Sequence, residues 1–267
     1  MVSSPTVNNV DVKVIEARFL KAVKHHLAGW KAKIENDFSE VNYATELASL
    51  QGDPVYSKFA LDCPEYVLVR LIGRMSISVG RRLGEMYDKL PRYLASARFN
   101  VPAEQVAEKF DGLELDIGLR FSALAPSDCT HLKSVLGRFG GMPKSTAGAG
   151  IEIRYNFNPN DSSRLRKDVE MAELLIAAKL VPIYLIYSAI SPRDEAIARL
   201  KRAGWHFLQG DEASGFTKDL FSVDFLGLLD KKEIREEIHQ DVREIMCTIF
   251  TSPAAKKLLS ATPIALT

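Results

Sequence analysis

The chain has 267 residues, of which 46% are hydrophobic and 26% are charged, and its formal net charge is +1. These values are ordinary for a globular protein with a large core, and they exclude a strongly basic protein whose overall charge would attract nucleic acid. Near-neutrality does not exclude DNA as a substrate, because the carboxylates of a catalytic cleft offset a basic rim.

The cysteines and the apolar runs indicate the compartment in which the protein resides. The cysteines are odd in number and far apart, so they form neither a disulfide framework nor a Cys-x-x-Cys pair: Cys63, Cys129 and Cys247. The segment Met1–Val10 is polar and lacks the apolar core of a signal peptide. The longest apolar run, Leu174–Ile186, contains Lys179 and Pro182 and is too short to span a bilayer. We therefore expect a cytoplasmic protein without membrane contact.

The N-terminal part of the chain is predicted to be helical. Apolar residues recur at helical spacing from Val12 to about Ser39, which indicates one long helix or two. A connection with a short helical piece is expected at Asn42–Pro54, followed by a second helical region at Glu65–Leu94. A short helix at Val101–Lys109 and a turn at Phe110–Gly112 come next. The second helical region is unusually basic, and its cationic residues are Arg70, Arg74, Arg81, Arg82, Lys89 and Arg92. Such a stretch is usually a solvated helix face, although it could also neutralise DNA phosphates in a salt-dependent manner.

Two segments with two-residue alternation are predicted to be half-buried β-strands. In Leu113–Phe121 every odd position is apolar, and Ile151–Asn158 repeats the pattern. The glycine-rich segment Gly137–Gly150 between them is expected to be a mobile loop or turn. For either strand alone, exposure of the polar face to solvent is the simpler interpretation.

The rest of the chain is predicted to alternate helices and strands. A turn with helix caps is expected at Asn158–Ser163, an amphipathic helix at Arg164–Leu180 and a buried strand at Val181–Ser188. These are followed by a helix at Pro192–Ala203, a short strand at Trp205–Gln209, a loop with a helix at Asp211–Leu229 and a terminal helix at Lys231–Phe250. This order predicts an α/β fold with a central mixed β-sheet flanked by helices and with an N-terminal helical region. We expect one domain over residues 1–267, with a mainly helical part at about 1–100, an α/β catalytic core at about 110–230, and a C-terminal helix and tail at 231–267.

The polar faces of the two predicted strands carry a candidate metal site. The side chains that share a face are Glu114, Asp116 and Arg120 on the first strand, and Glu152, Arg154, Asn156 and Asn158 on the second. If the strands are neighbours, Asp116 and Glu152 come within reach of a shared cation. Two carboxylates, a backbone carbonyl and waters are oxygen ligands of the kind that hold Mg²⁺. Such an ion activates a water molecule and neutralises charge on a cleaved phosphate, and Arg154 would lie beside that water.

These residues resemble the motif of the PD-(D/E)xK nuclease family, particularly of type II restriction endonucleases. The match consists of Asp116 in LELDIGLRF and Glu152-Ile153-Arg154 in IEIRYNFN, followed by a helix and a buried apolar strand. The resemblance implies that Asp116 and Glu152 ligate Mg²⁺, with the carbonyl of Ile153 as a third ligand. It also implies that Arg154 takes the place of the family's lysine as a catalytic residue.

The resemblance extends over about residues 74–230 and implies a restriction-endonuclease-like core. The run RMSISVGRRLGEMYDKL is similar to the helix that precedes the core in many restriction enzymes, which implies that Glu85 is a catalytic residue near the site. An ordinary acid on a helix surface is the simpler interpretation of Glu85.

Two features differ from the pattern of that family. Arg154 stands in the place of a lysine, and an arginine stabilises charge but cannot serve as a general base. No proline precedes Asp116, and the gap between Asp116 and Glu152 is long. A second carboxylate from the following helix, Glu170 or Glu173, is therefore an alternative to Glu152.

The expected DNA contacts come from basic and amide side chains: Arg81, Arg82, Arg138, Lys144, Asn156 and Asn158. The loop GRFGGMPK lacks the glycine that directly precedes the lysine of a P-loop. We expect it to present Arg138 and Lys144 to a DNA groove, with an ordinary surface loop as the alternative. Cys129 and His131 have no second pair at zinc-ligand spacing, so a structural role is favoured for both.

The hypothesis that follows is a bacterial type II restriction endonuclease with Mg²⁺ as its cofactor. Its expected partner is double-stranded DNA with a short palindromic site, and a homodimer is expected because a two-fold target is matched by a two-fold protein. One alternative is a non-catalytic DNA- or partner-binding module on the same fold. Another is a repair or recombination nuclease that recognises DNA structure. The recognition sequence cannot be predicted, because base contacts depend on loop geometry.

Overall fold

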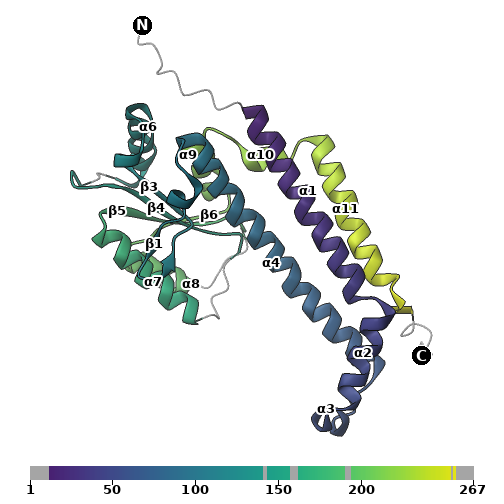
Figure 1. The fold of residues 1–267 in the computed structure, drawn as a ribbon. Helices are drawn as coiled ribbons and strands as arrows, with labels where there is room; N and C mark the ends of the chain where they lie inside the picture. The colour runs from purple at the N-terminus through teal and green to yellow at the C-terminus, as the bar shows by residue number, and fades with distance from the viewer. Residues whose placement is uncertain (1–11, 141–142, 157–161, 190–193, 254, 257–267) are drawn as a thin grey trace. The chain divides into compact units, whose positions relative to one another are not determined.

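Figure 1 shows the computed structural model of the chain, which describes residues 12–140, 143–156, 162–189, 194–253 and 255–256. The chain divides into two units by its internal contacts. The first unit comprises Gly84–Leu229 and the N-terminal segment as far as Phe19, and the second comprises Leu20–Leu83 and the residues from Asp230 onward. The single domain expected from the sequence stays a prediction.

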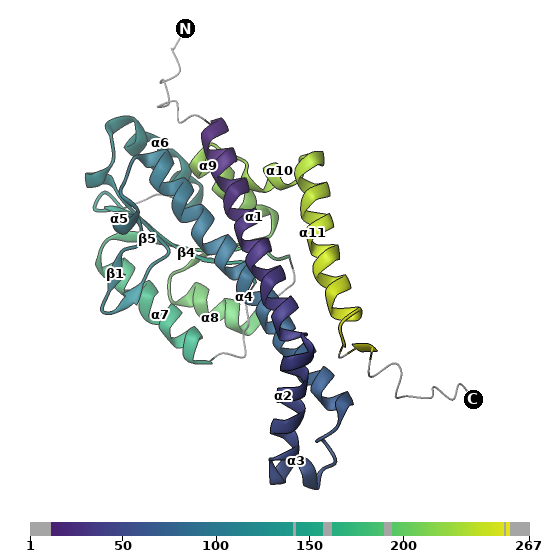
Figure 2. The ribbon, with the colours of Figure 1, turned by 45° about the vertical axis from the view of Figure 1, so that its right-hand side comes forward.

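The second unit is built from helices. It contains most of α1 (Val12–Asp37), α2 (Glu40–Gln51), α3 (Pro54–Lys58), the first part of α4 (Pro64–Phe99), and α11 (Lys232–Phe250). Figure 2 shows α1 and α11 side by side, and two ion pairs connect them at 2.7 Å each, Lys24 with Glu237 and Lys31 with Glu244. The segment expected to be a connection, residues 42–54, belongs mostly to α2. The side chain of Ser39 caps that helix by accepting a hydrogen bond from the backbone N–H of Asn42.

The first unit contains a mixed four-stranded sheet, which confirms the predicted α/β fold with a central sheet flanked by helices. Its strand order is β3 (Ile117–Arg120), β4 (Gly148–Arg154), β5 (Leu180–Ile186) and β6 (His206–Gln209). Strand β3 is antiparallel to β4, whereas β4, β5 and β6 are parallel. The remaining helices of this unit beyond α4 are α5 (Ala103–Val106), α6 (Pro126–Leu136), α7 (Ser162–Ala177), α8 (Asp194–Arg202), α9 (Asp211–Phe221) and α10 (Phe225–Leu229), with short 3₁₀ turns at Phe121–Ala123 and Gly137–Phe139.

Helices α7 and α8 cover one face of the sheet (Figure 1). Their apolar side chains form a buried cluster with the strands, whose largest members are Met171, Leu175, Tyr184, Leu200 and Trp205. The contact between α7 and β4 is close because Gly150 has no side chain, and a Cβ there would lie 2.5 Å from Cδ2 of Leu175. None of the described helices is long and apolar enough to cross a membrane.

The segment expected to be one strand at Leu113–Phe121 is divided into two. Its first part is β2 (Leu113–Glu114), which pairs with β1 (Lys109–Phe110) in a hairpin. Asp111 and Gly112 form the two-residue turn with φ of 46° and 82°, as an Asp-Gly hairpin turn requires. The second part is β3, and the chain leaves the hairpin for the main sheet at Leu115 and Asp116. A pattern of alternation cannot reveal such a change of partner strand.

The second predicted strand is shifted in position and is more buried than expected. Strand β4 begins at Gly148, inside the segment expected to be a loop, and ends at Arg154 rather than Asn158. Six of its seven residues are buried, and β3 is buried at three of four positions. The expectation of a polar face in solvent is therefore wrong for β3 and β4, although Glu114 in β2 is exposed as expected. In β4 the polar face is covered by α7, as the close approach of Leu175 to Gly150 shows.

A buried ion pair connects α4 to α6 within the first unit. Nη1 of Arg98 donates to Oδ1 of Asp128 at 2.7 Å, and both side chains are 4% exposed. Replacing Asp128 by asparagine leaves a buried arginine without a negative partner, which should lower the free energy of unfolding by about 3–5 kcal/mol. Urea denaturation measures this loss. The control Asp219→Asn breaks an exposed pair with Arg138 and should cost less than about 1 kcal/mol, and equal losses in the two variants would contradict the prediction.

Candidate functional site

The strand register brings the two predicted carboxylates together. Ile117 pairs with Ile151 in the antiparallel ladder of β3 and β4, so Asp116, one residue earlier, lies beside Glu152, one residue later. Glu152 in turn pairs with Tyr184 of the parallel neighbour β5. The candidate site therefore lies where β3 begins and β4 ends.

Asp116 is only 4% exposed, and three hydrogen bonds hold its carboxylate in place. Its Oδ1 accepts from Nη2 of Arg92 on α4 at 2.5 Å. Its Oδ2 accepts from the backbone N–H of Ile153 at 2.7 Å and from Nη1 of Arg154 at 3.2 Å. The bond to Ile153 joins the start of β3 to the end of β4, so the carboxylate position is fixed by the backbone of the sheet.

Glu152 is 5% exposed, and its two carboxylate oxygens differ in their surroundings. Oε1 accepts from Nη2 of Arg154, whereas Oε2 is buried and accepts no hydrogen bond from the described residues. Burial, together with the negative charge of Asp116, raises the pKa of Glu152 to about 8, although Arg154 opposes the shift. A buried carboxylate with an unsatisfied oxygen favours the arrival of another positive group.

A third carboxylate, Asp168 of α7, faces the same arginine. Its Oδ1 lies 3.7 Å from Nη2 of Arg154, and its Oδ2 accepts from the hydroxyl of Tyr184 at 2.9 Å. The indole N–H of Trp205 donates to the backbone carbonyl of Asp168 at 2.7 Å. Burial raises the pKa of Asp168, with Arg154 and the bond from Tyr184 opposing. Tyr184 of β5 and Trp205, the residue before β6, thus hold the helix and its carboxylate in place.

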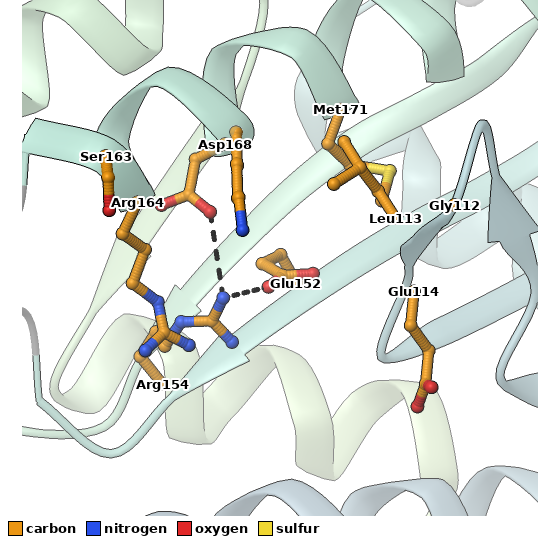
Figure 3. A pocket seen from close by; sticks show the side chains of 10 residues that line it. Gly112, Leu113, Glu114, Glu152, Arg154, Ser163, Arg164, Asp168 and Met171 are labelled. Atoms are coloured by element: carbon orange, nitrogen blue, oxygen red, sulfur yellow. Dashed lines mark hydrogen bonds and ion pairs between the residues drawn. The ribbon is translucent and has the colours of Figure 1, made fainter.

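The guanidinium of Arg154 lies between Glu152 and Asp168 (Figure 3) and also pairs with Asp116. Its Nη1 also donates to the carbonyl oxygen of its neighbour Ile153 at 2.7 Å. Burial lowers the pKa of Arg154, but Glu152 and the other surrounding acidic groups outweigh it and raise the pKa above its usual value. The side chain is therefore permanently charged.

A cavity of about 400 Å³ opens beside this cluster. It is lined by both acidic and basic side chains, which are Glu114, Glu152, Arg154, Arg164, Lys167 and Asp168, together with Gly112, Leu113, Ser163 and Met171. Figure 3 shows Ser163, Arg164 and Asp168 extending from α7 and Glu114 from the opposite side. The arrangement places cationic groups next to the buried carboxylates, which suits an anionic ligand that also contacts a metal ion.

The structure also places two further residues predicted for the site. Glu85 is half-buried on α4 and follows Gly84, where an added Cβ would lie 3.6 Å from Cδ1 of Tyr155. This part of α4 is therefore close to the residue that follows β4. Asn156 is half-buried two residues beyond β4, and Asn158 lies outside the described residues.

The loop residues predicted for DNA contact are not brought to this end of the sheet. Lys144 is exposed in the turn before β4, and β4 has seven residues, so its ends are roughly 20 Å apart. Arg138 forms an ion pair with Asp219 of α9 and lies over the ring of Phe216, 5.3 Å from its centroid. Arg81 and Arg82 belong to the second unit. Contact of these residues with DNA stays a prediction.

The alternative helix carboxylates lie on the solvent side of α7. Glu170 and Glu173 are both exposed and do not line the cavity, whereas Asp168 does. A signal for Asp168 was present in the sequence, because it precedes Ala172 and Leu175 by four and seven residues. That spacing places an acid within the apolar stripe of the helix, where a charge is unusual.

Arg92 of α4 is a further residue of the site whose role the sequence does not indicate. Its Nη1 donates to Oε1 of Glu114 at 2.5 Å in addition to its bond with Asp116. The basic stretch of α4 therefore includes at least one residue that supports the site. Charge density along a helix gives no means of distinguishing such a residue from a solvated neighbour.

No group of three or more histidine, cysteine, aspartate or glutamate side chains in the described part of the chain is positioned to hold a metal ion. The candidate set consists of two carboxylates and a carbonyl. Cys129 and His131 form separate hydrogen bonds to backbone carbonyls, Sγ of Cys129 to Phe121 at 3.1 Å and Nε2 of His131 to Leu220 at 3.0 Å. These bonds agree with the structural role favoured for both residues.

No known protein family, curated protein or solved structure matches the chain. The assignment of a function therefore depends on the residues of the site and their geometry alone.

Proposed function

We propose that the chain is a Mg²⁺-dependent deoxyribonuclease of the PD-(D/E)xK family, and that it works in the cytoplasm as a homodimeric type II restriction endonuclease. One observation carries this proposal. The carboxylates of Asp116 and Glu152 and the carbonyl of Ile153 surround one positive group at the end of β4, beside an open cavity. Burial of carboxylates is costly unless they are paired, so such a cluster beside a cavity is typical of a functional site.

The donor atoms fit a small, hard divalent cation. They are oxygens, as Mg²⁺ prefers, and Oε2 of Glu152 is buried without a hydrogen-bond donor among the described residues. Asp116, Glu152 and the Ile153 carbonyl would hold the ion. When bound, Mg²⁺ supplies positive charge that stabilises a phosphodiester under attack and makes water more acidic.

The chain's own side chains supply charge stabilisation and orientation for phosphodiester hydrolysis. Arg154 stays protonated, so it neutralises charge that develops on the phosphate but does not remove a proton from water. Asp168 orients Arg154 from α7, and Tyr184 fixes Asp168. Glu85 keeps its proposed catalytic role because its neighbour Gly84 lies close to Tyr155, the residue that follows β4.

One observation favours a non-catalytic binding module as the second candidate function. Arg154 already neutralises Asp116 and Glu152 in part. A site that works without a metal ion needs a cation of this kind beside its carboxylates. In that case the cavity would bind a DNA phosphate or an acidic partner without cleaving it.

Digestion of plasmid DNA discriminates between these functions. The protein, incubated with a plasmid of known sequence and Mg²⁺, should yield discrete fragments whose ends share one short palindromic sequence when they are sequenced. Binding in a mobility-shift assay without any cleavage would favour the module. Nicking that follows hairpins or junctions, and is independent of sequence, would indicate a repair nuclease and would contradict the restriction assignment.

Lys167 offers a test of how DNA is oriented at the site. Its side chain lines the cavity from α7, where it could contact a DNA phosphate. If it does, Lys167→Ala should weaken the binding of all duplexes and lower the slope of log Kd against log salt by about one. Fluorescence anisotropy in EDTA measures both quantities. Arg166→Ala is the matched control, because Arg166 is an exposed cation on the same helix that does not line the cavity. Equal salt slopes for the two variants would refute the contact.

A further inference from the structure

The guanidinium of Arg154 contacts the same three groups that are proposed to hold the metal ion, which are the carboxylates of Asp116 and Glu152 and the carbonyl of Ile153. Its Nη1 lies 2.7 Å from the carbonyl oxygen of Ile153 and 3.2 Å from Oδ2 of Asp116, and its Nη2 donates to Oε1 of Glu152. A planar guanidinium with several donors is well suited to fill such a position. The oxygen atoms are therefore already engaged by a cation that belongs to the chain.

We infer that Arg154 is the resident cation of this oxygen site in the metal-free protein and that a divalent cation binds there only by displacing the guanidinium. The inference rests on the proposed metal site. It follows from the geometry, because the guanidinium lies between the two carboxylates and the carbonyl, where an ion held by all three groups would have to lie. Since one positive group replaces another, the buried carboxylates keep a positive partner in both states.

The structure contains a second partner for the displaced guanidinium. Oδ1 of Asp168 lies 3.7 Å from Nη2 of Arg154, on the side of α7 (Figure 3). The hydroxyl of Tyr184 and the indole of Trp205 hold Asp168 in that position, through its carboxylate and its backbone carbonyl. A short movement would thus transfer Arg154 from Glu152 to Asp168 without leaving an unpaired buried charge.

The cavity gives this movement a function in catalysis. Both Arg154 and Asp168 line it, so the displaced guanidinium stays at the wall where the phosphodiester is proposed to lie. Binding of the metal ion and presentation of the arginine to the phosphate would then be one coupled event. A lysine has a single compact charge and no planar fork, so it would occupy the three oxygens less completely.

Titration of the full-length protein with Mn²⁺ alone, without DNA, tests the competition directly. Isothermal titration calorimetry should show that Arg154→Gln binds Mn²⁺ more tightly than the wild-type protein by between about fivefold and a hundredfold, the range of ordinary coupling between two ligands. Arg154→Lys should fall between the two, and it keeps the charge if the glutamine variant fails to fold. Arg120→Gln is the control, because Arg120 pairs with Glu108 away from the site and should leave Mn²⁺ affinity unchanged.

The outcomes separate this inference from the proposed function. Equal Mn²⁺ affinity of the wild type, Arg154→Lys and Arg154→Gln, or weaker binding by the variants, would overturn the competition while leaving a metal-dependent nuclease intact. Absence of Mn²⁺ binding by folded wild-type and variant proteins would overturn both. Tighter binding by the variants supports the competition even if no DNA is cleaved.

Discussion

Glu152→Gln should lower the rate of Mg²⁺-dependent plasmid cleavage by roughly a thousandfold, and Asp116→Asn should do the same. Each substitution keeps the size of the side chain and removes one negative charge from the proposed ligand set. Loss of a metal ion removes several kcal/mol of transition-state stabilisation, which corresponds to this factor in rate. Single-turnover digestion of supercoiled plasmid measures the change.

Glu114→Gln is the matched control for these variants. Glu114 lines the same cavity and pairs with Arg92, but its side chain is 48% exposed and contacts neither Glu152 nor Arg154 in the described interactions. Its cleavage rate should stay within a few-fold of the wild type. If Glu152→Gln retains full activity while Asp116→Asn is inactive, the second ligand is another group, and Asp168 is then the nearest candidate on α7.

The metal-free wild-type protein should lose stability relative to Glu152→Gln as the pH rises from about 5 to about 8. Burial and the charge of Asp116 raise the folded-state pKa of Glu152 from 4.5 to about 8. Within this window the folded protein holds a proton that the unfolded chain releases, so increasing pH favours unfolding. The difference should amount to a few kcal/mol across the window, since each pKa unit corresponds to about 1.4 kcal/mol. Glutamine has no such proton.

Urea denaturation in EDTA, repeated across this pH range, measures the effect. Glu114→Gln, whose side chain also lines the cavity, serves as the matched variant in the same measurement. Parallel profiles for the wild type and Glu152→Gln would show that Glu152 is ionised at neutral pH in the folded protein. Mg²⁺ should reduce the wild-type loss, because a bound cation favours the ionised carboxylate.

Most of the sheet could be predicted from local patterns. The apolar run at residues 181–188 gave a buried strand, and β5 covers Leu180–Ile186 with six of its seven residues buried. The turn predicted at Phe110–Gly112 is confirmed at Asp111 and Gly112, which both have positive φ, whereas Phe110 belongs to β1. Helix α6 (Pro126–Leu136) was not predicted, although Pro126 starts it in a favoured first-turn position.

The burial of the polar strand faces could not be predicted. Alternation of polar and apolar residues is ordinarily produced by a strand with one side in water. Here Asp116 and Glu152 are 4% and 5% exposed, and hydrogen bonds and ion pairs from Arg92, Ile153 and Arg154 satisfy much of their charge. Tertiary packing of a helix against β4, which Gly150 permits, is a long-range effect that a local pattern does not contain.

The candidate site was predicted in part. Asp116, Glu152 and Arg154 were identified from their spacing, and the register of β3 and β4 brings them together. Asp168 and Arg92 were missed because each approaches from a helix whose position over the sheet depends on the complete fold. The acid within the apolar stripe of α7 is the one local feature that indicated Asp168.

Cleavage of plasmid DNA by the wild-type protein as a function of Mg²⁺ concentration tests the central claim most directly. Supercoiled plasmid should stay intact in EDTA, and added Mg²⁺ in excess should restore cleavage into discrete fragments, with a saturating dependence on the ion. Unchanged cleavage in EDTA, or intact plasmid at every Mg²⁺ concentration with protein that is folded and binds DNA, would contradict a metal-dependent nuclease site at Asp116 and Glu152.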